Sequence, residues 1–281
     1  MEHLWLPENV STFGGEVDWL FYLILAITGV AFVLTEVLLV LFLVKYRARP
    51  GARAHYTHGS HALEVAWTII PAVILVVIAL VQRDTWRKVK MDFPKAGAAD
   101  VLQVELLAKQ FEWRFCYAGP DGKFATADDV YSTNELHVPL GKKVLIKARS
   151  QDVLHSFFLP HYRLKQDIVP GMNIPIWFEP TKTSAQAAQE KLRREGKAET
   201  PETLAKALTS CWDIACAELC GLGHSRMRGQ LVVETQAEFD AWLAKTKKDF
   251  PEPPAPEGRW AFDWDSLPQF KRPSAPAGEH K

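Results

Sequence analysis

A short segment near residue 220 gathers the side chains best suited to bind a soft metal ion. Residues 216–227 read CAELCGLGHSRM, which places two thiols, one imidazole and one thioether close together. Sulfur donors combined with an imidazole suit copper, whereas calcium and magnesium prefer oxygen ligands. A mononuclear blue-copper site uses only one cysteine, so the second cysteine is surplus to it. Two thiolates bridging a pair of copper ions would use both, and the segment therefore predicts a binuclear electron-transfer centre.

The predicted centre lacks a second imidazole, which must come from elsewhere in the chain. His155 is the best candidate, because it lies at the end of a strand-like run within the apolar segment SQDVLHSFFLP. A lone histidine in such a place is more often a core residue, but a second imidazole is what residues 216–227 lack. His161 competes for this role, and strand geometry alone does not exclude it.

The four cysteines also allow simpler interpretations. Cys216 and Cys220 could form a disulfide, which is the default outside the cytoplasm. They could bind zinc with one histidine, but three protein ligands leave a structural zinc site incomplete and methionine is a poor zinc ligand. Cys116 and Cys211 either pair with each other or remain buried thiols.

Two apolar runs, residues 19–44 and 63–81, precede the cysteine-containing part of the chain. Crossing about 30 Å of hydrocarbon takes roughly 20 apolar residues, and both runs meet that length. The first run has an acidic flank and exceeds a signal-peptide core, so we expect a retained helix. Glu36 lies within this run and is expected to face a partner subunit or a polar neighbour. Residues 17–82 are thus predicted to form a transmembrane helical hairpin after an outer N-terminal segment, residues 1–16.

The charges around the runs predict how the hairpin crosses the membrane. The connecting residues 45–53 carry four basic side chains and no acid. The positive-inside rule places this segment in the cytoplasm and both termini outside, although a second basic cluster follows the second run. The formal net charge of zero gives no reason to expect a nucleic acid as a partner.

The remainder of the chain has the pattern of a mainly β domain, residues 83–250. Short β-favouring runs recur between turn signals, which indicates an antiparallel sandwich or barrel. Residues 183–208 are rich in helix-forming types and predict a helical insertion with a break near Gly196 and Pro201. Residues 237–245 have the pattern of a short amphipathic helix, and the Pro-rich tail, residues 251–281, is expected to be extended or disordered.

Several motifs together resemble subunit II of the haem-copper cytochrome c oxidases, from the first apolar run to about Glu234. The most specific is Cys216-x-Glu218-x-Cys220-x-x-x-His224-x-x-Met227. Supporting motifs are Asp152-Val-Leu-His155-Ser, Leu164-Lys-x-Asp167 before Pro170-Gly171, and Glu64-x-x-Trp67-Thr-x-x-Pro71. The resemblance implies a cupredoxin-like β-sandwich with a helical insertion, anchored to the membrane by a two-helix hairpin.

The same resemblance implies a dinuclear Cu(A) centre and its ligands. The metal ligands would be His155, Cys216, Glu218 through its backbone carbonyl, Cys220, His224 and Met227. The Glu218 side chain would reach a Mg or Mn site shared with subunit I, with a solvated carboxylate as the alternative. Glu64 would be the mouth of a proton channel, with an interfacial carboxylate facing water as the alternative.

Phe111 occupies the position where the family usually has an exposed tryptophan that receives the electron, and Trp113 follows two residues later. Strand side chains alternate faces, so the two rings are expected to point the same way and either could lie under a docked haem edge. A packed core position is the alternative for Trp113. Asp152 and similar acidic residues could help to steer a basic cytochrome c.

The resemblance implies that electrons from cytochrome c, or a similar haem or copper donor, enter an oxidase through this chain. They would pass from Cu(A) to haem in subunit I, where oxygen is reduced to water with proton translocation; no catalytic residue is expected in this chain. It would sit with other oxidase subunits and membrane lipid in a bacterial cytoplasmic or mitochondrial inner membrane, its β domain on the outer, periplasmic face.

Three other classes of protein share some of these features. A quinol oxidase subunit II lacks the Cys, His and Met set that this chain keeps. Nitrous oxide reductase has a similar copper segment but is soluble and carries a second, His-rich copper domain. A membrane-tethered copper-delivery protein would release its copper readily to a mild chelator.

Overall fold

The structure, a computed structural model, describes residues 6–51, 53 and 56–249. The expected Pro-rich tail, residues 251–281, lies outside the described residues. The chain divides into a helical unit, Gly15–Lys88, and a mainly β unit formed by the residues on either side of it. The ligands predicted from the sequence all belong to the β unit.

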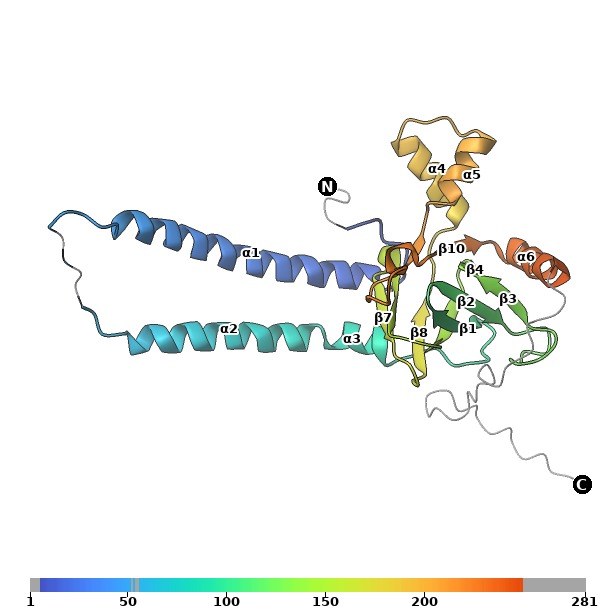
Figure 1. Cartoon of the computed structure of the whole chain (residues 1–281), viewed down its shortest axis with the longest axis horizontal. Helices are drawn as coiled ribbons and strands as arrows, with labels where there is room; N and C mark the ends of the chain where they lie inside the picture. The colour runs from blue at the N-terminus through green and yellow to red at the C-terminus, as the bar shows by residue number, and fades with distance from the viewer. Residues whose placement is uncertain (1–5, 52, 54–55, 250–281) are drawn as a thin grey trace, which may run out of the picture. The chain divides into compact units, whose positions relative to one another are not determined.

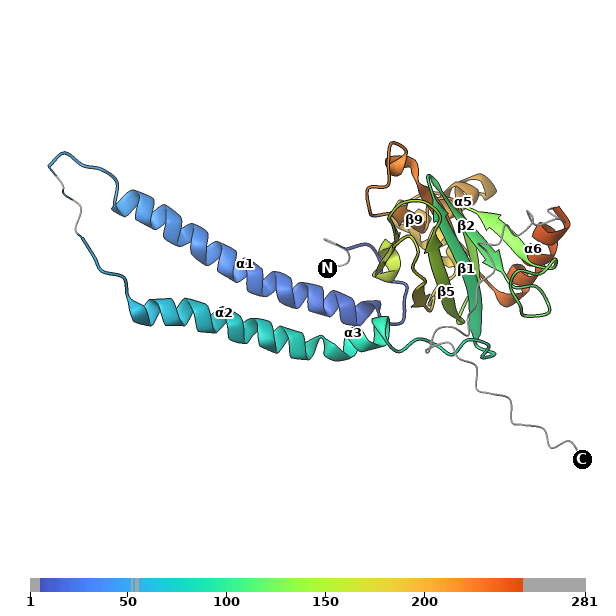
Figure 2. The same ribbon diagram turned by 60° about the horizontal axis from the view of Figure 1, so that its bottom comes forward.

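The helical unit consists of α1 (Gly14–Lys45), α2 (His61–Val81) and α3 (Arg83–Lys90). Figures 1 and 2 show α1 and α2 running antiparallel. Both are long and apolar enough to cross a membrane. Most of their apolar side chains are exposed, so within this chain they lack the core that a soluble hairpin would bury them in. This pattern is typical of helices that lie against lipid or other membrane helices.

The β unit contains two five-stranded sheets that pack against each other (Figure 2). The first has the order β3-β2-β1-β5-β8 and the second the order β4-β10-β9-β6-β7. The strands are β1 (Val101–Lys109), β2 (Glu112–Tyr117), β3 (Val130–Thr133), β4 (Glu135–Pro139), β5 (Lys143–Ser150), β6 (His155–Leu159), β7 (Leu164–Ile168), β8 (Ile174–Phe178), β9 (Asp213–Cys216) and β10 (Arg228–Glu234).

The sheets are mixed, which corrects the expectation of a purely antiparallel domain. β1 pairs in parallel with β5, and β10 pairs in parallel with β4. Parallel neighbours need a long crossover rather than a tight turn, and each of these pairs is separated in sequence by several other strands. Periodicity identifies strands, but it does not reveal which distant strands become neighbours.

The core between the sheets is built from large side chains of facing strands. Trp113 in β2 and Phe157 in β6 are both fully buried, with ring centroids 5.6 Å apart in an edge-to-face arrangement. Burial of a large apolar side chain contributes about 1.5–3 kcal/mol. These rings fix the first sheet against β6, the strand that begins at His155.

The helical insertion consists of α4 (Ser184–Arg194) and α5 (Pro201–Leu208). Thr183 and Thr200 each form a capping box at the start of their helix. The break follows the sequence pattern, because Gly196 has a φ of +64° and Pro201 begins α5.

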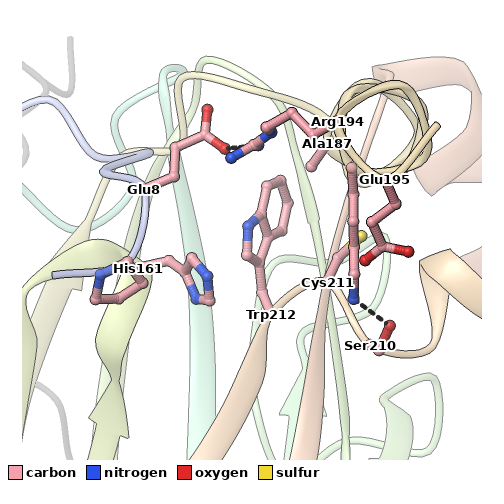
Figure 3. Close-up of a pocket in the computed structure, with 10 residues that line it drawn as sticks. Glu8, His161, Ala187, Arg194, Glu195, Ser210, Cys211 and Trp212 are labelled. Atoms are coloured by element: carbon pink, nitrogen blue, oxygen red, sulfur yellow. Dashed lines mark hydrogen bonds and ion pairs between the residues drawn. The ribbon is translucent and has the colours of Figure 1, made fainter. Parts of the chain in front are cut away.

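The N-terminal segment runs along the β unit and meets the insertion. The backbone N–H of Val10 donates to the carbonyl of His161 at 3.0 Å, and the carboxylate of Glu8 binds Lys182 and Arg194. A cavity of about 340 Å³ lies where this segment, α4 and the sandwich meet (Figure 3). At the far end of the unit, α6 (Gln236–Asp249) stacks Trp242 on His137 with centroids 4.0 Å apart.

Candidate metal centre

The ends of three strands in one sheet position the predicted ligands. His155 opens β6, and Cys216 is the last residue of β9. β6 pairs antiparallel with β9, with Phe157 opposite Cys216, so the two ligands lie at the same end of these neighbouring strands. Met227 directly precedes β10, and its carbonyl accepts a hydrogen bond from the N–H of Cys216 at 3.3 Å.

The segment between Cys220 and Met227 folds into tight turns that bring its own ligands inward. A short 3₁₀ helix covers His224–Arg226, and the N–H of His224 donates to the carbonyl of Gly221 at 3.1 Å. The N–H of Met227 donates in turn to the carbonyl of His224 at 3.1 Å. Such turns bring the imidazole of His224 and the thioether of Met227 close to the sulfur of Cys220.

Six donor groups converge at this point. The Sγ atoms of Cys216 and Cys220 are 3.8 Å apart, far beyond the roughly 2.05 Å of a disulfide. The remaining distances are Cys216 Sγ to His155 Nδ1, 3.9 Å; Cys216 Sγ to the Glu218 carbonyl, 3.3 Å; Cys220 Sγ to His224 Nδ1, 3.6 Å; and Cys220 Sγ to Met227 Sδ, 3.7 Å. The disulfide interpretation is therefore wrong.

The two thiols differ in acidity because their surroundings differ. Burial raises the pKa of Cys216, but hydrogen bonds with His155 and with the backbone around it outweigh burial and lower the pKa to about 6. Burial and the nearby Cys216 raise the pKa of Cys220 to about 11. One thiolate forms readily, and a cation is needed to stabilise the second beside it.

Asp152 fixes the orientation of His155. The Oδ1 atom of Asp152 lies 2.9 Å from Nε2 of His155, which leaves Nδ1 facing Cys216. Burial raises the pKa of Asp152, but hydrogen bonds from the Gln110 N–H, His155 and the Val153 N–H outweigh it and hold the pKa below its usual value. Ligating histidines commonly carry such a carboxylate on the other nitrogen. Its spacing of three residues before His155 was the available sequence signal for this role.

Gln110 joins the centre to the turn between β1 and β2. Its N–H donates to Asp152 Oδ2 at 2.7 Å, and its side-chain amide donates to the Cys220 carbonyl at 2.6 Å. No sequence pattern marked Gln110, because both bonds depend on tertiary structure.

Phe111 and Trp113 do not point the same way, contrary to the strand-based expectation. Phe111 precedes β2 and lies in the turn, so strand alternation does not apply to it. Phe111 is 37% exposed, and its ring lies against Gly221 and Gly223 of the ligand segment, residues 216–227. Trp113 is fully buried, and its ring centroid is 6.1 Å from that of His155. Trp113 is therefore a core residue, and only Phe111 of the two rings is accessible to a docked protein.

The other candidates lie outside the centre. His161 lines the cavity beside Glu8 and Trp212 (Figure 3), so it does not compete with His155. Cys116 and Cys211 are separate buried thiols, and the Sγ atom of Cys211 donates to the Ala207 carbonyl at 3.1 Å.

Glu64 lies in the first turn of α2 and is exposed, with one carboxylate oxygen 3.8 Å from His61 Nδ1. Glu218 turns its carbonyl toward Cys216, while its side chain is partly exposed. Both carboxylates are therefore accessible to groups outside this chain.

The donor set fits a pair of copper ions. Two sulfurs near enough to share two metals are flanked by two imidazole nitrogens, one thioether and one carbonyl. Soft sulfur and imidazole ligands favour copper, and a closed tetrahedral zinc site has no use for the thioether.

Comparisons with known proteins agree with this fold. Residues 2–82 match the transmembrane domain of cytochrome c oxidase subunit II, and residues 120–189 match its periplasmic domain. A cytochrome c oxidase subunit 2 of Alkalihalophilus pseudofirmus is 30% identical, over 92% of this chain and 69% of that protein. An alternative cytochrome c oxidase subunit 2 of Bradyrhizobium diazoefficiens is 27% identical, over 86% of this chain and 84% of that protein.

Among solved structures, the periplasmic domain of subunit II of cytochrome oxidase from Bradyrhizobium japonicum is 25% identical, with a TM-score of 0.40, over 56% of this chain and 98% of that one. The two apolar helices and the β-sandwich define a membrane-anchored cupredoxin-like protein. Within that class, the chain belongs to the cytochrome c oxidase subunit II family.

Proposed function

We propose that this chain is the subunit through which electrons enter a cytochrome c oxidase, one at a time, from cytochrome c or a similar donor. The observation that carries the proposal is the convergence of two sulfurs 3.8 Å apart with two imidazoles, a thioether and a carbonyl. Two copper ions held there would share one electron and so accept and release electrons singly. Reduction of oxygen and proton translocation are assigned to haem-containing subunit I.

The chain's own contribution is to hold the ligands rigidly and keep water away. His155, Cys220 and Met227 are almost fully buried, and each is fixed by a strand or a tight turn. A site whose ligands are locked by packing and by hydrogen bonds changes little when its charge changes. Asp152 adds to this by holding the ring of His155.

The surface over the centre is suited to a transient partner. Phe111, Leu219 and Leu222 are exposed apolar side chains on and beside the ligand segment. Apolar contact area close to the centre allows a donor protein to dock without burying many charges. We therefore place the point of electron entry at Phe111 rather than at Trp113, because only the ring of Phe111 can lie under a docked donor.

Two carboxylates complete the proposal. Glu218 would reach a Mg or Mn ion shared with subunit I, since its carbonyl faces the copper centre while its side chain remains available. Glu64 would form the mouth of a proton channel at the cytoplasmic end of α2. The β domain would then lie on the outer face of the membrane, in line with the periplasmic description of its family.

The proposal is tested by loading the purified full-length chain with copper. We expect two copper ions per chain, mixed-valence absorption, and an EPR hyperfine pattern from one electron shared by two copper nuclei. An EPR hyperfine pattern from a single copper nucleus would contradict the proposal. Copper that a mild chelator removes at once would instead favour a delivery protein.

Asp152→Asn is expected to weaken copper binding by about tenfold, because the amide can still accept a hydrogen bond but no longer supplies a negative charge to His155. The measurement is a competition titration with a copper chelator. Asp121→Asn, in an exposed loop remote in sequence from the ligands, is the control. Equal copper affinities for Asp152→Asn and wild type would show that the Asp152 carboxylate does not strengthen copper binding through His155.

A further inference from the structure

Glu36 is a carboxyl group in the middle of an apolar helix. It lies 18 residues after Asp18 and nine before Lys45, and no other acidic or basic side chain occurs between them. At about 1.5 Å per residue, Glu36 is roughly 14 Å from Lys45 along the helix. In a span centred on residues 19–44, that places it about 7 Å from the middle of the hydrocarbon layer. Carboxyl groups at such depth are costly unless they meet a polar group.

The described part of this chain does not supply that polar group. No hydrogen bond or ion pair joins the Glu36 carboxyl to any described residue, and α2 contains no basic side chain after His61. The neighbouring hydroxyl of Thr35 donates to a carbonyl of its own helix at 2.8 Å. The hydroxyl of Thr68 in α2 does the same. Apart from His61 at the start of α2, Trp67 is the remaining side-chain donor of this helix and can be tested directly.

Gly29 lies on the same face of α1 as Glu36 and would allow another helix to approach that face closely. It precedes Glu36 by seven residues, or about two helical turns, so both lie on one stripe. A Cβ atom added at Gly29 would meet nothing within 4 Å, so no part of the structure requires glycine there. Small residues in membrane helices let a second helix approach closely and are enriched at helix–helix contacts.

We propose that the Gly29–Glu36 face of α1 binds a membrane-spanning helix of another oxidase subunit, and that this helix donates a hydrogen bond from a basic, hydroxyl or indole side chain to Glu36. The inference rests on the proposed function only in taking the chain as part of an oxidase complex. Lipid tails cannot satisfy the carboxyl group, and the glycine gives a neighbouring backbone room to approach.

The test uses the complex purified from membranes in mild detergent through a tag on this chain. The readout is haem bound per copy of the tagged chain. Glu36→Leu is expected to lower this ratio roughly threefold to twentyfold, the range for losing one hydrogen bond between membrane helices. Glu36→Gln should retain most of the haem, because the amide oxygen still accepts a hydrogen bond.

Matched variants separate the contact from general effects on the helix. The exchange Glu36→Leu with Leu38→Glu keeps the composition but moves the carboxyl group to the other side of α1, and should fail like Glu36→Leu. Gly29→Leu should lower the haem ratio, whereas Ala31→Leu, on the opposite side, should not. Restoration by the exchange, or equal effects at positions 29 and 31, would overturn the proposal.

Two further measurements show whether a lower haem ratio comes from losing the contact with the partner helix. If Trp67→Phe reproduces the loss seen with Glu36→Leu, the donor belongs to this chain and the proposal is wrong. The copper spectrum, recorded on the same samples, should be unchanged in every variant because all lie in the helical unit. Its absence from the wild-type chain would contradict the proposed function, whereas the haem ratio tests the contact surface.

Discussion

Cys220→Ser is expected to convert the two-copper centre into a site for at most one copper ion. Cys220 is central to the donor set, because its sulfur lies 3.8 Å from Cys216, 3.6 Å from the imidazole of His224 and 3.7 Å from the thioether of Met227. A serine hydroxyl is a poor ligand for copper, which favours thiolate donors. What remains is one cysteine, two histidines and one methionine, the set of a mononuclear blue-copper site.

The variant should therefore bind one copper ion per chain instead of two and give a hyperfine pattern from a single nucleus. Electron transfer from reduced cytochrome c to the complex should fall by more than about 100-fold, since loss of an outer partner alone costs 10–100-fold. The measurements are metal analysis, EPR and oxygen uptake.

Cys211→Ser is the matched control for this experiment. Cys211 is a buried thiol whose sulfur bonds to the Ala207 carbonyl, outside the donor set. It should leave copper content and spectrum unchanged. Two copper ions in the Cys220→Ser variant would show that the thiolates do not bridge.

The ligand segment could be predicted from the sequence because most of its chemistry is local. Cys216, Cys220, His224 and Met227 lie within one short segment, and short-range turns are enough to bring their donor atoms together. The choice of His155 over His161 needed more information. The pairing of β6 with β9 decides it, since that pairing puts His155 beside Cys216.

Features that depend on distant contacts were not accessible from one sequence. The parallel pairs of β1 with β5 and β4 with β10 follow from how the chain crosses over, which strand periodicity does not encode. The alternation of strand side chains predicts one face for Phe111 and Trp113, but this rule holds only where both residues lie in a strand. β2 begins only at Glu112, so Phe111 lies in the turn and contacts the ligand segment, while Trp113 enters the core.

The contact between Phe111 and the ligand segment gives the second prediction, for Gly223→Ala. A Cβ atom at Gly223 would lie 2.4 Å from Cδ2 and 2.6 Å from Cγ of the Phe111 ring, which is closer than real Cβ contacts allow. The backbone itself is unstrained for alanine, with a φ of −91°. Either the ring or the ligand segment must move, and Gly223 is adjacent to the ligand His224.

We expect this overpacking to cost about 1–3 kcal/mol. That cost corresponds to copper binding about 5- to 150-fold weaker than in wild type. Chelator competition measures the affinity, and the optical spectrum reports whether the geometry around His224 has changed.

Phe111→Ala tests whether a steric clash with the Phe111 ring causes the weaker copper binding of Gly223→Ala. Phe111→Ala removes the ring that the new methyl group would strike, so the double variant Phe111→Ala with Gly223→Ala should regain copper affinity close to wild type. Electron transfer from the donor should nevertheless stay slow in the double variant and in Phe111→Ala alone, because both lack the exposed ring. If the double variant binds copper as weakly as Gly223→Ala, the clash is not the cause. If Phe111→Ala transfers electrons at the wild-type rate, the donor docks elsewhere on the surface over the centre.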